Sequence, residues 1–559
     1  MRFTLPIITL LSSPTLTSSL SPSDPLTVKT TTGTFTGLID PQFPNVRQFR
    51  SIPYALPPLG PRRWLPPVAV SPSLKHSFAY RFPPSCSQYN SKNATAWTTS
   101  INSFAIRLYG QDYTAGAMAQ ASSEDCLYLA IWTPLLPTPT STTESSSSPL
   151  PVALFIPGGD FVGGGVDVPY QKPAGWVERS KSHIVVTANY RLNIGGFPWA
   201  AGLETQNLGL LDARLALEWV YANIASFNGD PSRITLWGQS AGGVAVDMLA
   251  HAWPDEPLIS GLFMMSGTAM VSINPPDPTH SNFTFVSKNL GCDFPDDPTA
   301  ELSCMRQVPM TLIQNYMGQY RDNATKPTLS FRPFPDEKTV FANYSLRASS
   351  GGLAKVPAIV SITSNEHATL YKYPVTNLTE GPYQPSVDKG TVGVFVCLAS
   401  NTTQVRKRLG LTTYRYEYSG NFSSVTPFWW MGAYHASDIP MVFGTYEGRF
   451  GTTVDGGIAE SESENATYVD DKGGQTGPGW VSKVGGFQRE VADRMQDYLL
   501  AFMRDPEGGP RGLGWPAYGD GEGKNMLRIA ASGRVARNVS ADEVDGACVL
   551  GREWNSRPE

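Results

Sequence analysis

The chain lacks the features that would assign it to a membrane or to a nucleic acid. Beyond the first residues, no window of the 559-residue sequence contains the ~18 apolar residues that a bilayer-spanning helix needs. Lysine and arginine form no long run, and the formal net charge is −5. Neither a nucleic acid nor an anionic membrane attracts such a chain electrostatically. We therefore expect no nucleic-acid partner, no transmembrane segment and no hydrophobic anchor at the C-terminus.

Cysteine and histidine are scarce, at six residues each. The cysteines form no CxxC pair and do not lie near clustered histidines, so we expect no zinc site, and nothing else indicates a metal or an organic cofactor. An even number of cysteines in an exported protein is typical of disulfides, but spacing alone leaves all of their pairings open. They are Cys86, Cys126, Cys292, Cys304, Cys397 and Cys548.

The first residues predict a secretory signal peptide over residues 1–19. A short basic start is followed by an apolar stretch over residues 3–11 and then by small residues. The alternative, a buried strand, is disfavoured by Pro6 and by the Ser- and Thr-rich end of the segment. A high density of N-glycosylation sequons agrees with export through a eukaryotic secretory route, so we expect a secreted glycoprotein. The nine sequons are at Asn93, Asn282, Asn323, Asn343, Asn377, Asn401, Asn421, Asn465 and Asn538.

Apolar segments that alternate with helical patterns predict the fold class. Strands are expected at residues 128–132, 152–156, 184–188, 234–237, 262–266 and 358–362. Residues 211–224 carry apolar side chains at helical spacing. Continuous apolar strands between helices predict an α/β protein with a large, mostly parallel central sheet covered by helices on both faces. No repeat and no linker divides the chain, so residues 20–559 are expected to form a single domain.

Four further segments have simpler patterns. Residues 28–37 predict the start of a β-hairpin, and the proline-rich residues 51–60 predict an irregular segment. The low-complexity residues 137–149 and the acidic, glycine-rich residues 458–474 are expected to be surface insertions.

Residues 238–242 (GQSAG) predict the position of a nucleophile. A β-branched and apolar strand precedes them, and a helical segment follows over residues 243–250. A strand that turns sharply into a helix through G-x-S-x-G is a nucleophile elbow, which lifts the serine hydroxyl above the sheet. The hydroxyl of Ser240 would lie at the N-terminus of a helix, whose amides favour developing negative charge.

The base and the acid follow from chain order. A serine hydroxyl needs an imidazole to accept its proton and an acid to orient that imidazole, and in elbow-type hydrolases the order is Ser, acid, His. His435 is the histidine that remains after the others are excluded, and it lies on a Gly- and Ala-containing loop beside aromatic residues. Glu366 follows the predicted strand at residues 358–362 after a short turn. His76, His183, His251, His280 and His367 are excluded because they precede Ser240, lie on the elbow helix or in a Pro/Asp-rich loop, or adjoin Glu366.

An oxyanion hole completes the predicted site. One donor is the backbone amide after the nucleophile, that of Ala241, and the others should come from a glycine-rich turn after an earlier strand. Residues 157–160 (PGGD) form such a turn at the end of the strand at residues 152–156.

Several longer motifs together resemble the type-B carboxylesterase/lipase family, the cholinesterase-like branch of the α/β-hydrolase fold. They are SIPYALPPLGPRRW at 51–64, EDCLYL at 124–129, NYR at 189–191, the run from NLGLLD at 207–212 to FNGDP at 227–231, and the histidine motif at 432–444. The resemblance covers residues 28–548, and it implies the α/β-hydrolase fold with loop and helix insertions that form a lid.

The resemblance also implies roles for particular residues. Ser240 would be the nucleophile, Glu366 the acid and His435 the base, with the oxyanion held by the amides of Gly159, Asp160 and Ala241. The implied disulfides join Cys86 to Cys126, Cys292 to Cys304 and Cys397 to Cys548, and the loop that the first one closes would act as a lid. Phe161, Trp429 and Trp430 are candidates to line the substrate pocket.

The chain departs from the family pattern at several positions. Asp160 stands where the oxyanion turn usually has a third glycine, and a carboxylate aimed at the hole would oppose the oxyanion. We predict that its side chain turns away or is paired. Gln239 precedes the nucleophile where many relatives have Glu, and His367 replaces the usual Gly after the acid. Residues 114–118 lack the aromatic residue that contacts choline in cholinesterases, which argues against cholinesterase activity.

The sequence therefore predicts a secreted serine hydrolase that cleaves small-molecule carboxylic esters through an acyl-enzyme intermediate. One alternative is an interfacial triacylglycerol lipase. Another is a non-catalytic cholinesterase-like binding or adhesion protein. The natural ester and the oligomeric state stay open.

Overall fold

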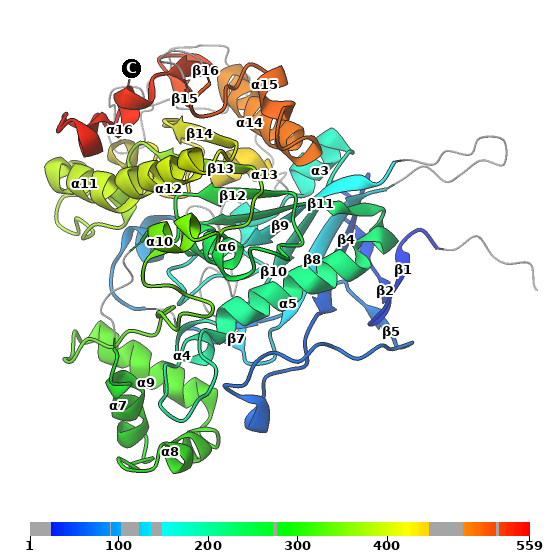
Figure 1. The fold of residues 1–559 in the computed structure, drawn as a ribbon, viewed down its shortest axis with the longest axis vertical. Coiled ribbons are helices and arrows are strands. Elements are labelled where there is room, and N and C mark those ends of the chain that lie inside the picture. The colour runs from blue at the N-terminus through cyan, green and yellow to red at the C-terminus, as the bar shows by residue number, and fades with distance from the viewer. Residues whose placement is uncertain are drawn as a thin grey trace, which may run out of the picture.

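A computed structural model describes residues 24–89, 91–101, 122–135, 148–271, 277–446, 485–520 and 525–558. The predicted signal peptide, most of the predicted lid, nearly all of the 137–149 loop and the insertion at 458–474 lie outside these residues. In the described part, the dominant feature is an eleven-stranded sheet with the strand order β16-β15-β14-β13-β12-β11-β9-β10-β8-β4-β3 (Figure 1).

The middle of this sheet is parallel and its ends are antiparallel. The pairs β10–β9, β9–β11, β11–β12, β12–β13, β13–β14 and β14–β15 are parallel. The strands predicted from sequence are β8 (Tyr128–Pro134), β9 (Leu150–Ile156), β10 (Ile184–Ala188), β11 (Gly229–Gln239), β12 (Gly261–Met265) and β13 (Ala358–Thr363). The others are β3 (Leu38–Ile39), β4 (Val46–Pro53), β14 (Thr413–Tyr418), β15 (Met526–Ala531) and β16 (Arg534–Val539). The prediction of a mostly parallel sheet is confirmed.

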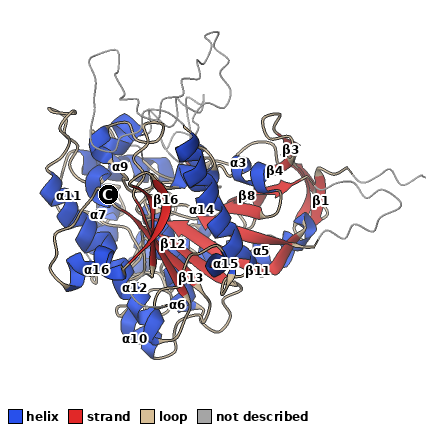
Figure 2. Cartoon of the chain, turned by 90° about the horizontal axis from the view of Figure 1, so that it is seen from above, coloured by secondary structure: helices blue, strands red, loops and turns tan. Residues whose placement is uncertain are grey.

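Both faces of the central strands are buried, which explains their continuous apolar runs. Side chains alternate between the faces, so Leu154 and Leu236 belong to one hydrophobic core while Phe155 and Trp237 belong to another. The first core also contains residues of α5 (Leu208–Asn223), α6 (Ala241–Ala252), α10 (Tyr344–Ser349), α12 (Cys397–Arg408) and α16 (Ala541–Val549). The second contains residues of α3 (Ala174–Ser180), α13 (Ile439–Phe443) and α14 (Gly486–Arg504). Helices therefore cover the sheet on both sides (Figure 2).

Three helices pack together away from the sheet, at the lower end of the molecule in Figure 1. They are α7 (Ser281–Asn289), α8 (Pro298–Met305) and α9 (Met310–Asp322), and they share a third, smaller core with Trp64 and Ile194. The disulfide between Cys292 and Cys304 closes the connection between α7 and α8.

The N-terminal hairpin is confirmed, whereas the irregular segment is partly wrong. β1 (Thr27–Thr30) and β2 (Gly33–Thr36) form an antiparallel pair, which β5 (His76–Phe78) extends in parallel. β4 continues to Pro53, through residues that the proline content predicted to be irregular. The strand accommodates the proline because Pro53 is its last residue and because the register shifts between Phe49 and Ile52.

All three disulfides implied by the family resemblance are present: Cys86–Cys126, Cys292–Cys304 and Cys397–Cys548. Among the described residues, no helix has the length and apolar character needed to cross a membrane.

Candidate active site

Ser240 lies in the sharp turn between β11 and α6, as the pentapeptide predicts. Its backbone has φ 57° and ψ −127°, a strained conformation for a residue with a side chain. Crowding explains why glycines flank it. A Cβ atom on Gly238 would lie 2.3 Å from the carbonyl carbon of Gly242, and one on Gly242 would lie 2.0 Å from the carbonyl oxygen of Ile156. The serine backbone is fixed to the next strand, because its N–H donates to the carbonyl of Met265 at 2.8 Å.

Glu366 and His435, which are 69 residues apart in sequence, are in direct contact. Nδ1 of His435 lies 2.5 Å from Oε2 of Glu366, and the other carboxylate oxygen accepts the backbone N–H of Thr363 at 2.8 Å. Both side chains are buried. A carboxylate accepts a hydrogen bond from N–H, so this contact places the imidazole proton on Nδ1 and leaves a lone pair on Nε2. That is the tautomer that a general base needs.

The free nitrogen of this imidazole faces the nucleophile elbow. Nε2 of His435 lies 3.2 Å from Nε2 of Gln239, the residue directly before Ser240. With the proton on Nδ1, the amide of Gln239 donates and the imidazole accepts. Among the described residues, no hydrogen bond joins Ser240 to His435. The contact between the hydroxyl and the imidazole therefore stays a prediction.

The predicted oxyanion turn lies directly against the elbow. A Cβ atom on Gly158 would be 3.1 Å from Cβ of Ser240 and 2.4 Å from the carbonyl oxygen of Gln239. The turn then runs through positive φ values at Gly159 (120°), Asp160 (56°) and Phe161 (59°). The carbonyl of Gly159 points back into the loop, where it accepts N–H groups from two following residues. The backbone of this turn is thus close enough to Ser240 to contribute amides to a shared site.

The side chain of Asp160 is paired, which confirms the prediction for this departure from the family pattern. Nε of Arg332 donates to Oδ1 of Asp160 at 2.9 Å, and a terminal guanidinium nitrogen bonds the second carboxylate oxygen. Burial alone would lower the pKa of Arg332, but the hydrogen bonds and the charge of Asp160 raise it above its usual value. The carboxylate is therefore neutralised by a partner from a distant loop.

Comparison with known proteins shows the family of the chain. A sequence model of the carboxylesterase family matches residues 24–392. The chain belongs to the carboxylesterase family. It is similar to a chlorogenic acid esterase of Aspergillus niger, at 36% identity over 97% of this chain and 99% of that protein. It is also similar to secreted lipase 5 of Gibberella zeae, at 35% identity over 94% of each chain. A third relative, lipase 4 of Diutina rugosa, is 32% identical over 59% of this chain and 60% of that protein.

Family membership makes this chain a carboxylic ester hydrolase with the α/β-hydrolase fold. The family match spans the oxyanion turn, the elbow and Glu366, whereas His435 lies beyond its end. The relatives from Aspergillus and Gibberella extend the similarity over nearly the whole chain.

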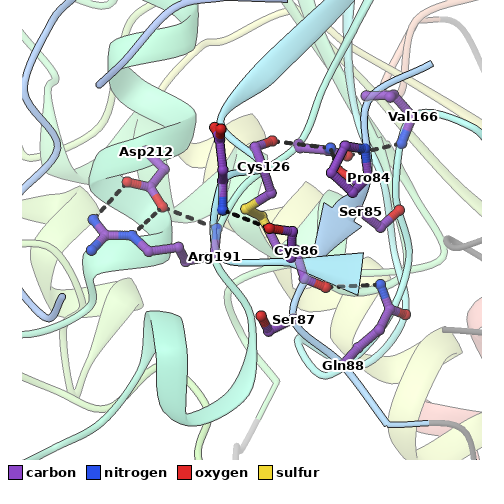
Figure 3. The surroundings of a disulfide bond; sticks show 12 residues. Pro84, Ser85, Cys86, Ser87, Gln88, Cys126, Val166, Arg191 and Asp212 are labelled. Carbon is purple, nitrogen blue, oxygen red and sulfur yellow. Dashed lines mark hydrogen bonds and ion pairs between the residues drawn. A yellow bond between two sulfur atoms is a disulfide. The ribbon is translucent and has the colours of Figure 1, made fainter. Parts of the chain in front are cut away.

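In this carboxylesterase, the first disulfide supports the loop that contains the predicted oxyanion turn. Figure 3 shows Cys86 bonded to Cys126, with Gln88 nearby. Gln88 donates to the carbonyl of Cys86 at 3.1 Å and exchanges two hydrogen bonds with the backbone of Gly164, at 3.0 and 3.1 Å. Asn189 donates to the carbonyl of Cys126 at 3.1 Å and accepts the N–H of Val166 at 2.9 Å. The disulfide segment thereby holds the far end of this loop, at Gly164 and Val166.

The acid loop is attached to the histidine loop by Asn365, which sequence reasoning missed. The backbone N–H of Asn365 donates to the carbonyl of Ala433 at 2.9 Å. Its side-chain amide donates to the carbonyls of Trp430 and Met431, at 3.1 and 2.9 Å. These hydrogen bonds of Asn365 fix the backbone directly before Glu366, and so they hold the loop of Glu366 against the loop of His435. The only signal in the sequence was the position of this asparagine next to the predicted acid.

A second buried carboxylate, Asp438, lies near the pair formed by Glu366 and His435. Its Oδ2 accepts the hydroxyl of Tyr416 at 3.0 Å, and Oδ1 is buried without a hydrogen-bond partner among the described residues. Burial and the negative charge of Glu366 raise the pKa of Asp438 to about 7. Sequence reasoning missed this residue, although it lies within the histidine motif three positions after His435.

The candidate pocket residues are largely packed. Phe161 is 3% exposed and meets Phe197 edge to face at 5.4 Å. Trp430 is 2% exposed and donates its indole N–H to the carbonyl of Leu378 at 2.7 Å. Trp429 is half-buried, with the guanidinium of Arg557 4.7 Å from its ring centre. Contact between these three side chains and a substrate stays a prediction.

Two of the excluded histidines have structural partners of their own. His251 lies in α6 and contacts the carbonyl of Gly352 at 2.9 Å, and His280 stacks on Trp199 at 5.1 Å. Burial, and after it the charge of the nearby His435, lowers the pKa of His367.

Proposed function

We propose that this carboxylic ester hydrolase is a secreted serine esterase whose catalytic triad is Ser240, Glu366 and His435. The observation that carries the proposal is the 2.5 Å contact between two buried groups, Nδ1 of His435 and Oε2 of Glu366, beside the elbow that contains Ser240. A buried carboxylate stabilises the imidazolium that forms when the histidine accepts a proton. The position of Gln239 against Nε2 of His435 supports the proposal further, because it brings the imidazole next to the neighbour of the serine.

In the first half of the reaction, the hydroxyl oxygen of Ser240 attacks the ester carbonyl carbon. Its proton passes to Nε2 of His435, where the hydroxyl takes the place of the Gln239 amide. Catalytic hydrogen bonds of this kind are often long or absent without substrate and form in the complex. The amides of Gly159, Asp160 and Ala241 stabilise the negative oxygen of the tetrahedral intermediate. The intermediate then expels the alkoxide, to which His435 returns the proton.

In the second half, water replaces the alcohol. Nε2 of His435 removes a proton from the water as the oxygen attacks the acyl-enzyme carbonyl. The second tetrahedral intermediate collapses, Ser240 regains its proton, and the carboxylic acid leaves. Glu366 keeps the imidazole oriented throughout. The triad and the backbone amides together supply the base, acid and oxyanion stabilisation that this cycle needs.

A serine replacement tests the proposal. Ser240→Ala should lower kcat on p-nitrophenyl butyrate by roughly 10⁵-fold or more and abolish labelling by a fluorophosphonate probe, as loss of the nucleophile does in other serine hydrolases. Ser349→Ala, at an exposed position on α10, is the matched control and should keep both signals. A Ser240→Ala enzyme that retains the activity of the control would refute the triad. A wild-type protein that neither hydrolyses the ester nor reacts with the probe would favour the non-catalytic use of the scaffold.

For the substrate, we propose esters of small organic acids that dissolve in water. The similarity to a chlorogenic acid esterase over nearly the whole of both chains supports this class. An interfacial lipase is the second candidate, because similar proteins from Gibberella zeae and Diutina rugosa are named lipases. Hydrolysis of tributyrin below and above its solubility limit separates the two, since an interfacial enzyme is activated only when droplets form.

We also propose that a signal peptide over residues 1–19 directs the chain out of the cell and that residues 20–559 form one catalytic domain. The similar protein from Gibberella zeae is named a secreted lipase, which supports export. N-terminal sequencing of protein from the culture medium of an expressing fungus tests this. A mature chain that begins near residue 20 is expected, and retention of the full N-terminus inside the cell would contradict it.

A further inference from the structure

The oxyanion turn places opposite demands on Asp160. Its backbone amide is one of the proposed donors to the oxyanion, whereas its side chain carries a negative charge that would repel the oxyanion. The residue has φ 56°, so its carboxylate branches from a tight left-handed turn. A carboxylate about 5 Å from the oxyanion, at an effective dielectric constant near 20, would slow the reaction by roughly 100-fold or more. The chain therefore requires something that controls where this carboxylate points.

Arg332 meets that requirement. It belongs to the connection between α9 and α10, 172 residues away in sequence, and it holds both oxygens of the Asp160 carboxylate. A guanidinium fork that bonds both oxygens fixes the direction of a carboxylate, which a single point charge does not. The side chain of Asp160 is 64% exposed, so without this partner it would be free to rotate.

The arginine itself is firmly anchored. Phe331, directly before it, is 3% exposed in the third hydrophobic core. Phe334, two residues after it, exchanges two hydrogen bonds with the side chain of Asn207, at 3.0 and 2.8 Å. A third guanidinium nitrogen donates to the hydroxyl of Ser330 at 3.2 Å. The loop thus holds Arg332 in place before any substrate binds.

From this geometry we infer that Arg332 is a positioning residue for the oxyanion hole. It holds the carboxylate of Asp160 away from the developing oxyanion and so allows an aspartate to occupy a position where the turn needs only an amide. The inference rests on the proposed function, because it assumes that the oxyanion forms beside Ser240. No covalent step passes through Arg332.

A double-mutant cycle tests the inference. Arg332→Met removes the guanidinium but keeps a long side chain, and it is made in the wild-type background and in Asp160→Gly. In the wild-type background it should lower kcat on p-nitrophenyl butyrate at least tenfold, with less than a twofold change in KM. In the Asp160→Gly background the same substitution should lower kcat less than twofold, because no carboxylate remains to be held.

Equal losses in the two backgrounds would overturn the inference, since Arg332 would then act independently of Asp160. A higher KM with unchanged kcat would also overturn it and would make Arg332 a contact to the substrate. Arg332→Lys keeps the positive charge without the fork, so its kcat should fall less than that of Arg332→Met. It also provides a second variant if Arg332→Met does not fold. An equal loss in Arg332→Lys and Arg332→Met would support the inference in its strictest form, in which the fork and not the charge alone holds the carboxylate, whereas full activity in Arg332→Lys would contradict a need for the fork.

Phenylboronic acid gives a readout that a purely structural role would not move. It forms a negative tetrahedral adduct with a reactive serine, so its inhibition constant should rise in Arg332→Met by about the factor by which kcat falls. An unchanged inhibition constant would contradict the inference. Ser240→Ala keeps the tests separate: if that variant stays active, the proposed function fails, whatever the cycle shows. If it is inactive and the cycle shows equal losses, only the role of Arg332 fails.

Discussion

Replacing Asp438 by asparagine should change how the stability of the protein depends on pH. This aspartate is fully buried near Glu366. One of its carboxylate oxygens accepts the hydroxyl of Tyr416, and the other has no hydrogen-bond donor among the described residues. Burial and the charge of Glu366 raise its pKa from 3.8 to about 7. Asparagine has the same shape as the protonated acid and no proton to lose.

The sign and the size of the effect follow from this pKa. Between pH 4 and pH 7 the unfolded chain loses the proton of Asp438 while the folded protein keeps it, so the free energy of unfolding falls as pH rises. Below pH 4 both states are protonated, and this group contributes nothing. The difference between pKa values of 3.8 and about 7 corresponds to a loss of about 4 kcal/mol above pH 7. Asp438→Asn removes this loss.

The assay is urea-induced unfolding with the disulfides intact, for wild type and variant, at several pH values from 4 to 8. Relative to wild type, the variant should gain stability from pH 4 to about pH 7 and then level off. Asp255→Asn, at an exposed position, is the control and should show no such trend. If the stability difference between Asp438→Asn and wild type is the same at pH 5 and pH 8, the aspartate is ionised throughout and the reasoning is refuted.

Three further predictions concern other parts of the molecule. Gln239→Glu places a negative charge beside Nε2 of His435, which favours the imidazolium, so the acid limb of the kcat/KM profile should move to higher pH; an unmoved limb contradicts the contact. Replacing Cys397 and Cys548 by serine opens a link across 151 residues and should lower the free energy of unfolding by about 5 kcal/mol, measured by urea unfolding; a loss below about 1 kcal/mol would contradict the constraint on the unfolded chain. Glycopeptide mass spectrometry should find a glycan on the exposed Asn401 and none on Asn282. Asn282 is only 9% exposed and donates its side-chain amide to the carbonyl of Ser330, so a glycan on Asn282 would be inconsistent with this packing.

The central strands and the elbow could be predicted because their causes are local. A strand buried on both faces must be apolar throughout, as β9 and β10 are, and the elbow needs glycines at 238 and 242 because any side chain there would clash with the backbone. β14 could not be found this way. It is fully buried yet contains Arg415 and Glu417, whose charges are balanced by Asp545 and Arg528 from elsewhere in the chain.

The sequence by itself determined the sheet core and the serine turn, and the order of its motifs predicted Glu366 and His435 as the acid and the base. Only the tertiary structure decided which partners surround the site: Arg332 bonds the carboxylate of Asp160, and Asn365 fixes the loop of Glu366. It also places the buried Asp438 near Glu366. The physical reason is that the cost of a buried or misdirected charge depends on its partners in space. Those partners come from segments that only folding brings together, so no local pattern records them.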